Sequence, residues 1–219
     1  NQYFQYSTRF NNGKYKQFNY TAFCTCGVRL TMKNQLRIIG GDWKRRQLPF
    51  ASIEGLRPTP DRVRETLFNW LMWDVQNTNV LDICAGSGAL AFEALSRGAS
   101  KVVMIEPDRS QAQFLTQNLE LLKVPKSRAQ LKVATAQQTL ATLKEQFDLV
   151  FLDPPYSLEL WEELALLADP LIQNNGYIYV EADRDLNLLK LPTSWVQIKS
   201  TKAGTVRAGL YQKKMVVSP

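Results

Sequence analysis

The chain has 219 residues, of which 45% are hydrophobic, and it carries a formal net charge of +7 at pH 7. This length suits one large domain with a full core, or one domain with a short extension. No stretch approaches 18 consecutive apolar residues, so we expect no membrane span. Histidine is absent, which excludes an imidazole base, a histidine-bound metal and a Ser-His-Asp triad.

Cysteine usage is typical of a protein in a reducing compartment. The three cysteines, Cys24, Cys26 and Cys84, cannot all pair with one another, and Cys84 lies in an apolar strand pattern. Cys24-Thr25-Cys26 has no second cysteine pair or histidine cluster beside it, so we expect no metal site. The N-terminus has no apolar signal segment, and the sequence therefore predicts a cytoplasmic protein.

Residues 1–31 differ from the rest of the chain. They are rich in Asn, Gln, Tyr and Phe, carry four basic residues and no acid, and follow neither a helical nor a strand period. We expect them to be an upstream extension, disordered or loosely packed, with Met32 as the natural start.

A basic segment follows at residues 32–64, with three acids and eight basic residues: Lys33, Arg37, Lys44, Arg45, Arg46, Arg57, Arg62 and Arg64. Such an excess forms either a solvated face or the binding surface for a polyanion. Within it, residues 36–52 alternate weakly around Gly40-Gly41-Asp42, which predicts two short strands joined by a turn.

Residues 57–75 predict a helix. Thr59 can cap it, Pro60 suits its first position, and Asp61 favours its dipole. Its apolar stripe, formed by Val63, Leu67, Trp70 and Leu71, has to face a sheet, which leaves its arginines for solvent or a ligand. Residues 32–75 are therefore expected to form a small hairpin and helix extension.

From residue 76 to residue 215 strands and helices alternate. Strands are predicted at 79–84, 101–106, 129–135, 147–153 and 176–183, helices at 88–98, 108–122, 136–143 and 158–168, and two antiparallel segments at 194–201 and 207–214. Apolar strands that alternate with helices form βαβ units. The pattern predicts an α/β, Rossmann-like domain with a mostly parallel seven-stranded sheet and a C-terminal antiparallel hairpin.

A glycine-rich turn joins the first strand of this domain to its first helix. Residues 86–91, Gly-Ser-Gly-Ala-Leu-Ala, match the dinucleotide fingerprint, and Glu106 ends the next strand, where an acid can accept hydrogen bonds from ribose hydroxyls. These features suit nicotinamide and adenosyl cofactors alike. Asp82 favours S-adenosylmethionine, because a carboxylate beside the loop is useless to a pyrophosphate but suits an amino group and a sulfonium.

The fourth strand of the domain ends in Asp153-Pro154-Pro155-Tyr156. The prolines fix the backbone and supply carbonyl oxygens without competing N–H donors. The Asp153 carboxylate and the Pro154 carbonyl can accept the two hydrogens of an exocyclic amine on a nucleobase, while Tyr156 stacks on the base. The motif therefore predicts an amine clamp for methyl transfer.

Three segments together resemble the RsmD-type family of 16S rRNA guanine-N2 methyltransferases: RPTPDRVRETLFNWL, DICAGSGALAFEALSRGA and FLDPPY. The resemblance covers residues 35–213. It implies methyl transfer from S-adenosylmethionine to the N2 amine of one guanine in 16S rRNA, in the small ribosomal subunit or its assembly intermediate. We also expect a monomer without metal.

Carried onto this sequence, the family motifs imply a cofactor site made of Asp82, Ala85, Gly86, Ser87, Gly88 and Glu106. They imply a catalytic clamp made of Asp153, Pro154, Pro155 and Tyr156. Ala134 and Thr135 stand where methyltransferases often have an acid for the adenine amine. For the RNA contact we select Lys44, Arg45, Arg46, Arg57 and Arg62, since arginines and lysines position nucleic acid through its phosphates.

Three other functions remain open on the residues alone. A DNA adenine-N6 methyltransferase uses the same amine clamp but usually has a separate target-recognition region. A non-catalytic RNA-binding module would have no use for an intact clamp and cofactor loop. A nicotinamide oxidoreductase offers no role for residues 153–156.

Overall fold

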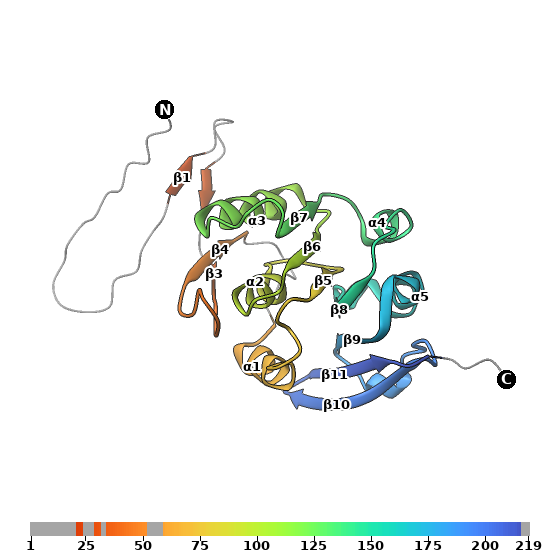
Figure 1. The fold of residues 1–219 in the computed structure, drawn as a ribbon. Helices are drawn as coiled ribbons and strands as arrows, with labels where there is room; N and C mark the ends of the chain where they lie inside the picture. The colour runs from red at the N-terminus through yellow and green to blue at the C-terminus, as the bar shows by residue number, and fades with distance from the viewer. Residues whose placement is uncertain (1–20, 24–28, 32–33, 52–58, 216–219) are drawn as a thin grey trace.

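The protein is described by a computed structural model over residues 21–23, 29–31, 34–51 and 59–215. A seven-stranded sheet in the order β10-β11-β9-β8-β5-β6-β7 lies at its centre (Figure 1). The strands are β5 (Asn79–Asp82), β6 (Lys101–Ile105), β7 (Ala129–Lys132), β8 (Phe147–Leu152), β9 (Ile172–Ala182), β10 (Trp195–Ala203) and β11 (Val206–Lys213). Strands β5 to β9 are parallel, and β11 lies antiparallel between β9 and β10. The predicted fold class is confirmed.

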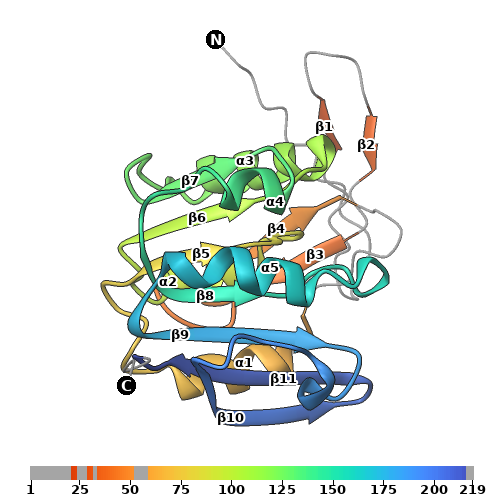
Figure 2. The ribbon, with the colours of Figure 1, turned by 90° about the vertical axis from the view of Figure 1, so that its right-hand side faces the viewer.

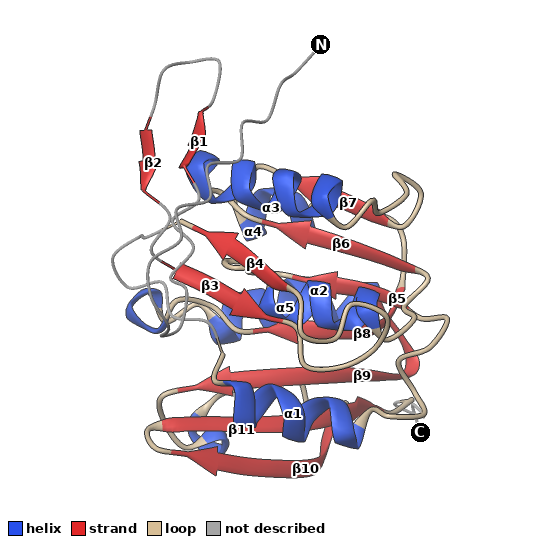
Figure 3. Ribbon diagram, turned by 90° about the vertical axis from the view of Figure 1, so that its left-hand side faces the viewer, coloured by secondary structure: helices blue, strands red, loops and turns tan. Residues whose placement is uncertain are grey.

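Helices cover both faces of the sheet. On one face lie α1 (Asp61–Trp70), α2 (Ala89–Ser96), α3 (Arg109–Leu121) and the hairpin of β3 (Asn34–Arg37) and β4 (Gln47–Phe50) (Figure 3). On the other lie α4 (Ala136–Leu140) and α5 (Trp161–Ala168) (Figure 2). Two apolar cores fill these layers, which explains why the central strands are apolar on both faces.

Several boundaries differ from the prediction. Helix α1 covers Asp61–Trp70 instead of 57–75, α5 begins at Trp161 instead of residue 158, and β7 ends at Lys132 instead of residue 135. Strand β9 begins at Ile172 rather than at residue 176, because a register irregularity against β8 lets the chain pair on both sides of Asn175, whose φ is +64°. Helix α4 ends at Leu140 rather than at residue 143. No helix among the described residues is long and apolar enough to cross a membrane.

Of the N-terminal extension the structure describes only β1 (Thr21–Phe23) and β2 (Arg29–Thr31), which pair antiparallel. Residues 1–20 and 24–28 lie outside the described residues. The expectation of a loosely packed extension stays a prediction.

The start of α1 corrects two expectations. Pro60, not Thr59, is the residue before the first turn, and no side chain caps the helix. The Thr59 hydroxyl instead donates a hydrogen bond of 3.4 Å to Asp153 Oδ2. Arg64, expected at the surface, is 1% exposed, and it forms ion pairs with Asp61 of its own helix and Glu93 of α2.

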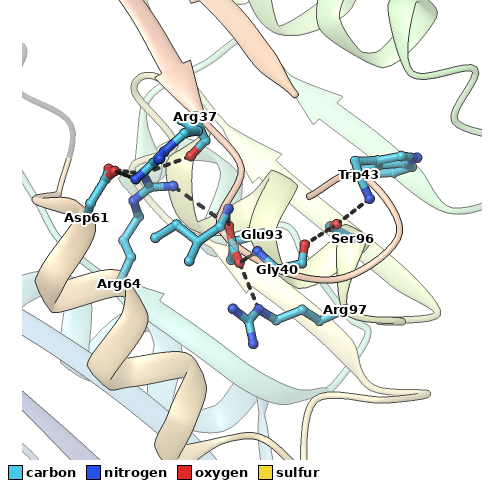
Figure 4. A network of polar contacts seen from close by, with 9 residues as sticks. Arg37, Gly40, Trp43, Asp61, Arg64, Glu93, Ser96 and Arg97 are labelled. Atoms are coloured by element: carbon cyan, nitrogen blue, oxygen red, sulfur yellow. Dashed lines mark hydrogen bonds and ion pairs between the residues drawn. The ribbon is translucent and has the colours of Figure 1, made fainter. Parts of the chain in front are cut away.

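Buried polar groups fasten the β3–β4 hairpin to α2 (Figure 4). The carboxylate of Glu93, in the middle of α2, accepts the backbone N–H groups of Ile39 (2.9 Å) and Gly40 (2.8 Å) and Nε of Arg97 (2.8 Å). One turn further along α2, Ser96 Oγ accepts the N–H of Trp43 at 2.9 Å. The hairpin is thus held by α2 through its connecting loop.

Arg64 completes this attachment from α1. Its Nη2 donates to Asp61 Oδ1 (2.5 Å) and to the carbonyl oxygen of Arg37 (3.0 Å), and its Nη1 lies 3.8 Å from Glu93 Oε2 (Figure 4). A guanidinium buried to this degree is tolerated only where carboxylates and carbonyls surround it. Helix α1, helix α2 and the hairpin are therefore joined by one charged network.

Candidate functional site

Four carboxyl groups lie at one edge of the sheet, on four neighbouring strands. In sheet order they are Glu181 in β9, Asp153 after β8, Asp82 at the end of β5 and Glu106 after β6. We call these four residues the acid row. The strands are parallel, so their carboxyl ends meet at this edge, which is where open α/β sheets bind ligands.

The glycine loop, residues 85–88, joins β5 to α2 beside the acid row. Gly86 and Gly88 have φ of +50° and +78°, a conformation that favours glycine. A Cβ on Gly88 would also lie 2.5 Å from the ring of Phe92. Ala85 is held by a hydrogen bond from its N–H to the carbonyl of Ile105 (2.9 Å), and Ser87 is buried beneath the turn.

Glu106 is oriented by backbone donors on both of its oxygens. Oε2 accepts the N–H of Gly86 at 2.9 Å, and Oε1 accepts the N–H of Asp108 at 2.8 Å. Each oxygen keeps a second lone pair, so the carboxylate can still accept two hydroxyl groups. Burial raises the pKa of Glu106, and the two backbone N–H groups act against that rise.

The same contact decides between cofactor classes. The N–H of Gly86 points to a carboxylate, whereas a loop that cradles a pyrophosphate needs its N–H groups free for the anion. Asp82, 2% exposed, adds a second acid next to the loop. Burial raises the pKa of Asp82 to about 7, and the nearby backbone amides of Ala91 and Cys84 partly offset this. The site suits a nucleoside with a cationic group better than a dinucleotide.

Asp153 stands at the centre of the acid row. It follows β8, contacts the Thr59 hydroxyl and is partly exposed, whereas Pro154 behind it is buried. Burial of its carboxyl, with the charges of Glu181 and Asp82 nearby, raises the pKa of Asp153 well above the usual range. A carboxyl of this kind binds protons strongly, and it is an effective acceptor once ionised.

Tyr156 is held by two contacts that the sequence did not reveal. Its ring packs on Trp161 with centroids 5.9 Å apart, and its hydroxyl donates to Glu181 Oε1 at 2.9 Å. Glu181, 3% exposed, also accepts the hydroxyl of Tyr179 at 2.6 Å. The signal for Glu181 was present, because an acid near the end of an apolar strand seldom lies there without a partner.

Of the residues selected for the RNA contact, the triplet Lys44, Arg45 and Arg46 is not brought together with the acid row. Lys44, Arg45 and Arg46 are exposed in the hairpin loop, beside the C-terminal end of α2. Helix α2 starts at the glycine loop, so this triplet lies toward the opposite edge of the sheet (Figure 3). Arg62 is exposed in the first turn of α1, and Arg57 lies outside the described residues.

Two further expectations concern the adenine contact after β7 and the absence of a metal site. Thr135 caps α4 by accepting the N–H of Gln138, so its hydroxyl serves the helix. Among the described residues, no three His, Cys, Asp or Glu side chains are grouped so that they could hold a metal ion. The prediction of a metal-free site stays a prediction.

The comparisons with known proteins agree with this geometry. A family model described as "Conserved hypothetical protein 95" matches residues 36–212. Ribosomal RNA small subunit methyltransferase D of Haemophilus influenzae is 44% identical over 187 residues, which cover 82% of this chain and 95% of the relative. The protein of that name from Escherichia coli strain K12 is 42% identical over 186 residues, covering 82% and 91%. The solved structure of yhhF from Escherichia coli has a TM-score of 0.76 at 42% identity and covers 83% of this chain and 99% of that one.

Proposed function

Because the chain belongs to the ribosomal RNA small subunit methyltransferase D family, we propose that it methylates the exocyclic N2 amine of one guanine in 16S rRNA. The observation that carries this proposal is the Asp153–Tyr156 motif in the acid row, one strand away from the glycine loop. The substrate is the small ribosomal subunit or an assembly intermediate of it. Such a substrate places the enzyme in the cytoplasm, and we propose that it acts as a monomer without metal.

S-adenosylmethionine supplies the electrophilic methyl group. The residues at the glycine loop fit this cofactor, because the Glu106 carboxylate is oriented by two backbone N–H groups and keeps lone pairs for two ribose hydroxyls. Asp82 places a buried carboxyl next to the loop, and the positive charge of an amino group or a sulfonium there would favour its ionised form. The turn itself is tight, because a Cβ on Gly88 would lie 2.5 Å from the ring of Phe92 and the small side chains of Ala85 and Ser87 are buried.

The clamp makes the guanine amine a nucleophile. The Asp153 carboxylate and the Pro154 carbonyl accept its two hydrogens, which draws the nitrogen lone pair out of conjugation with the ring and directs it at the methyl carbon. The N2–C bond forms while the carbon–sulfur bond breaks, and its electron pair stays on sulfur. The methylated amine then gives up one proton.

Tyr156 supports the base from one side. Its ring is backed by Trp161, and its hydroxyl is tied to Glu181, so the ring has a defined orientation before the base arrives. A stacking surface that is already ordered reduces the entropy lost when a flipped base is bound. The exposed cations Lys44, Arg45, Arg46 and Arg62 serve the RNA backbone in this proposal, together with Arg57.

One experiment tests the function. The purified protein is incubated with methyl-labelled S-adenosylmethionine and, in parallel, with small subunits that lack the modification, naked 16S rRNA or duplex DNA. Nucleosides from each digest are then separated by mass. We expect N2-methylguanosine from the ribosomal particles. Label in N6-methyladenine from the DNA would support the DNA methyltransferase instead, and no transfer to any substrate would contradict an enzymatic role.

A further inference from the structure

Glu181 is a buried acid in the site that the clamp mechanism leaves without a role. Leu152 and Val180 pair across the parallel strands β8 and β9, so the next residues, Asp153 and Glu181, lie side by side. Glu181 is 3% exposed, and leaving a carboxyl so deep in a protein is costly unless partners compensate for it. Its partners therefore indicate which charge it carries.

Two phenol groups hold Glu181 as an acceptor. Tyr179 donates to Oε2 at 2.6 Å and Tyr156 to Oε1 at 2.9 Å. Burial and the charge of Glu181 raise the pKa of both tyrosines, so both keep the proton that they donate. Burial raises the pKa of Glu181, and the hydrogen bonds from Tyr179 and Tyr156 act against that rise, so the two phenols favour a negative charge on this carboxyl.

Several elements pack around Glu181. On the β11 side Ala208 pairs with it, and the neighbouring Arg207 donates to the carbonyl oxygens of Gly204 and Thr205. Asp153 lies on the β8 side with the Thr59 hydroxyl, and Asp82 lies one strand further, on β5. From α5, Trp161 Nε1 donates to the backbone carbonyl of Glu181 at 2.7 Å. Arg184, after β9, forms its ion pairs with Asp183 and Glu159. Within the described residues, the ion pairs include neither Glu181 nor Asp153.

We propose that Glu181 is a positioning residue that holds a fixed negative charge beside Asp153 and thereby makes Asp153 the stronger acceptor for the protons of the guanine amine. The inference rests on the proposed function, since it assigns a role within the same site. Burial is the largest cause that raises the pKa of Asp153, and the charge of Glu181 comes next. The side-by-side position of the two carboxyls and the raised pKa of Asp153 indicate the same effect.

The proton balance of the step is simple. Before transfer, both carboxylates are ionised, and the amine hydrogens point at Asp153. When the N2–C bond forms, the nitrogen becomes cationic and passes one proton to the Asp153 carboxylate. Asp153 becomes a neutral acid, the two carboxyls then share one negative charge, which stays on Glu181, and the proton leaves to water after the product departs.

The decisive measurement is the pH profile of single-turnover methylation on small subunits for wild type and Glu181→Gln. Asp153 has to be ionised, so the rate rises with pH through its pKa. Removing the neighbouring charge lowers that pKa, so the acid limb of Glu181→Gln moves to lower pH by about one unit. The weaker acceptor also lowers the plateau rate, roughly three- to tenfold. An unshifted limb in a folded Glu181→Gln would overturn the inference.

Two further variants separate charge from packing. Glu181→Asp keeps the charge and should keep the acid limb near that of wild type. Tyr156→Phe also removes one donor to Glu181, so its limb should move in the same direction as that of Glu181→Gln but by less. If Tyr156→Phe reproduced the full Glu181→Gln profile, Glu181 would act only by holding the tyrosine.

A third variant covers the case in which Glu181→Gln does not fold. Tyr179→Phe removes one donor, which raises the pKa of Glu181 and weakens its charge, so the limb should move in the same direction by less. An unshifted limb in Tyr179→Phe would then overturn the inference. Wild-type protein is assayed first. If it formed no N2-methylguanosine, the proposed function would fail. If it were active but the acid limb of the variants did not shift, only the role of Glu181 would be rejected.

Discussion

The hydroxyl of Tyr156 donates a hydrogen bond of 2.9 Å to the buried carboxylate of Glu181, so the last residue of the Asp-Pro-Pro-Tyr motif is tied to the strand next to the one it follows. The sequence suggested a tyrosine that stacks through its ring alone. The structure adds a second function for the same side chain, because its hydroxyl helps to keep Glu181 ionised beside Asp153.

Tyr156→Phe and Tyr156→Ala should therefore differ in degree. The phenylalanine keeps the ring on Trp161 but loses the bond to Glu181, and we expect the methylation rate to fall by about tenfold, as for the loss of one hydrogen bond to a charged group. The alanine loses the ring as well and should fall by a further tenfold or more, roughly the stacking energy of one base. Single-turnover rates on small subunits measure both. Equal losses in the two variants would mean that the hydroxyl, and not the ring, accounts for the effect of Tyr156.

Asp153→Ala should abolish methyl transfer while S-adenosylmethionine binding changes little, because the carboxylate serves the base rather than the cofactor. Asp153→Asn is the matched control: it keeps the shape and one acceptor oxygen but cannot take the proton, and it should also be severely impaired. Rates are compared with cofactor dissociation constants from calorimetry. A variant with near-normal turnover would mean that the clamp assigned to residues 153–156 is wrong.

Glu106→Ala should weaken S-adenosylmethionine binding by roughly 1–3 kcal/mol, since polar groups of the cofactor would lose their acceptor. The N–H groups of Gly86 and Asp108 lose theirs too, so the melting temperature should fall as well. Calorimetry and thermal unfolding are run on the same preparation. Glu106→Gln keeps one acceptor oxygen, so its cofactor affinity and melting temperature should lie between those of wild type and Glu106→Ala. An unchanged dissociation constant in Glu106→Ala would remove this residue from the site.

Much of the fold followed from hydrophobic periodicity. The central strands are buried on both faces and short, and the helices between them carry clear stripes, so local pattern and global fold agree. The start of α1 did not follow, because Thr59 has the right residue type for a cap but is used by Asp153. Arg64 was placed at the surface for a similar reason: residue type predicts exposure, and only the packing of α1 against α2 and the hairpin buries it, between Glu93 and the carbonyl oxygen of Arg37.

The site was predictable where the motif is continuous in sequence. Residues 85–88 and 153–156 lie at strand ends, so their meeting at one edge follows from the topology. An acid near the end of an apolar strand marks Glu181 as unusual, but its place beside Asp153 depends on pairing between β8 and β9, which no local pattern encodes. The place of the hairpin loop beside the C-terminal end of α2 was equally hidden, since it depends on buried bonds to Glu93 and Ser96.

The Glu93 network should be a main source of stability for the N-terminal hairpin. Glu93→Ala leaves Arg97 and the backbone N–H groups of Ile39 and Gly40 without their carboxylate and takes from the buried Arg64 one of its two, and we expect a loss of about 3–5 kcal/mol in unfolding free energy. Glu93→Gln keeps one acceptor and should lose less. Urea unfolding at unchanged slope gives both values. A loss below about 1 kcal/mol in the alanine variant would mean that the network contributes little.

The last prediction concerns Lys44, Arg45 and Arg46. They are exposed on a loop that buried bonds hold against α2, so the three cations are presented in a fixed place, although toward the edge away from the acid row. A ribosomal particle is large enough to contact both edges, and phosphate contacts position the RNA without reading its sequence. The triple alanine variant should therefore bind small subunits more weakly, methylate the same guanine and bind S-adenosylmethionine normally.

The salt dependence of small-subunit binding by the triple alanine variant decides whether Lys44, Arg45 and Arg46 contact the RNA. Each lost phosphate contact should flatten the slope of log affinity against log salt by about 0.7–0.9, so three lost contacts flatten it by about 2–3. Arg62→Ala is the matched control, because Arg62 is a single exposed cation in the first turn of α1, next to Thr59 and the acid row, and it should flatten the slope by about one contact. If the triple variant kept the slope of wild type while Arg62→Ala changed it, the RNA would lie along the acid-row edge alone, and the hairpin loop would be a solvated face.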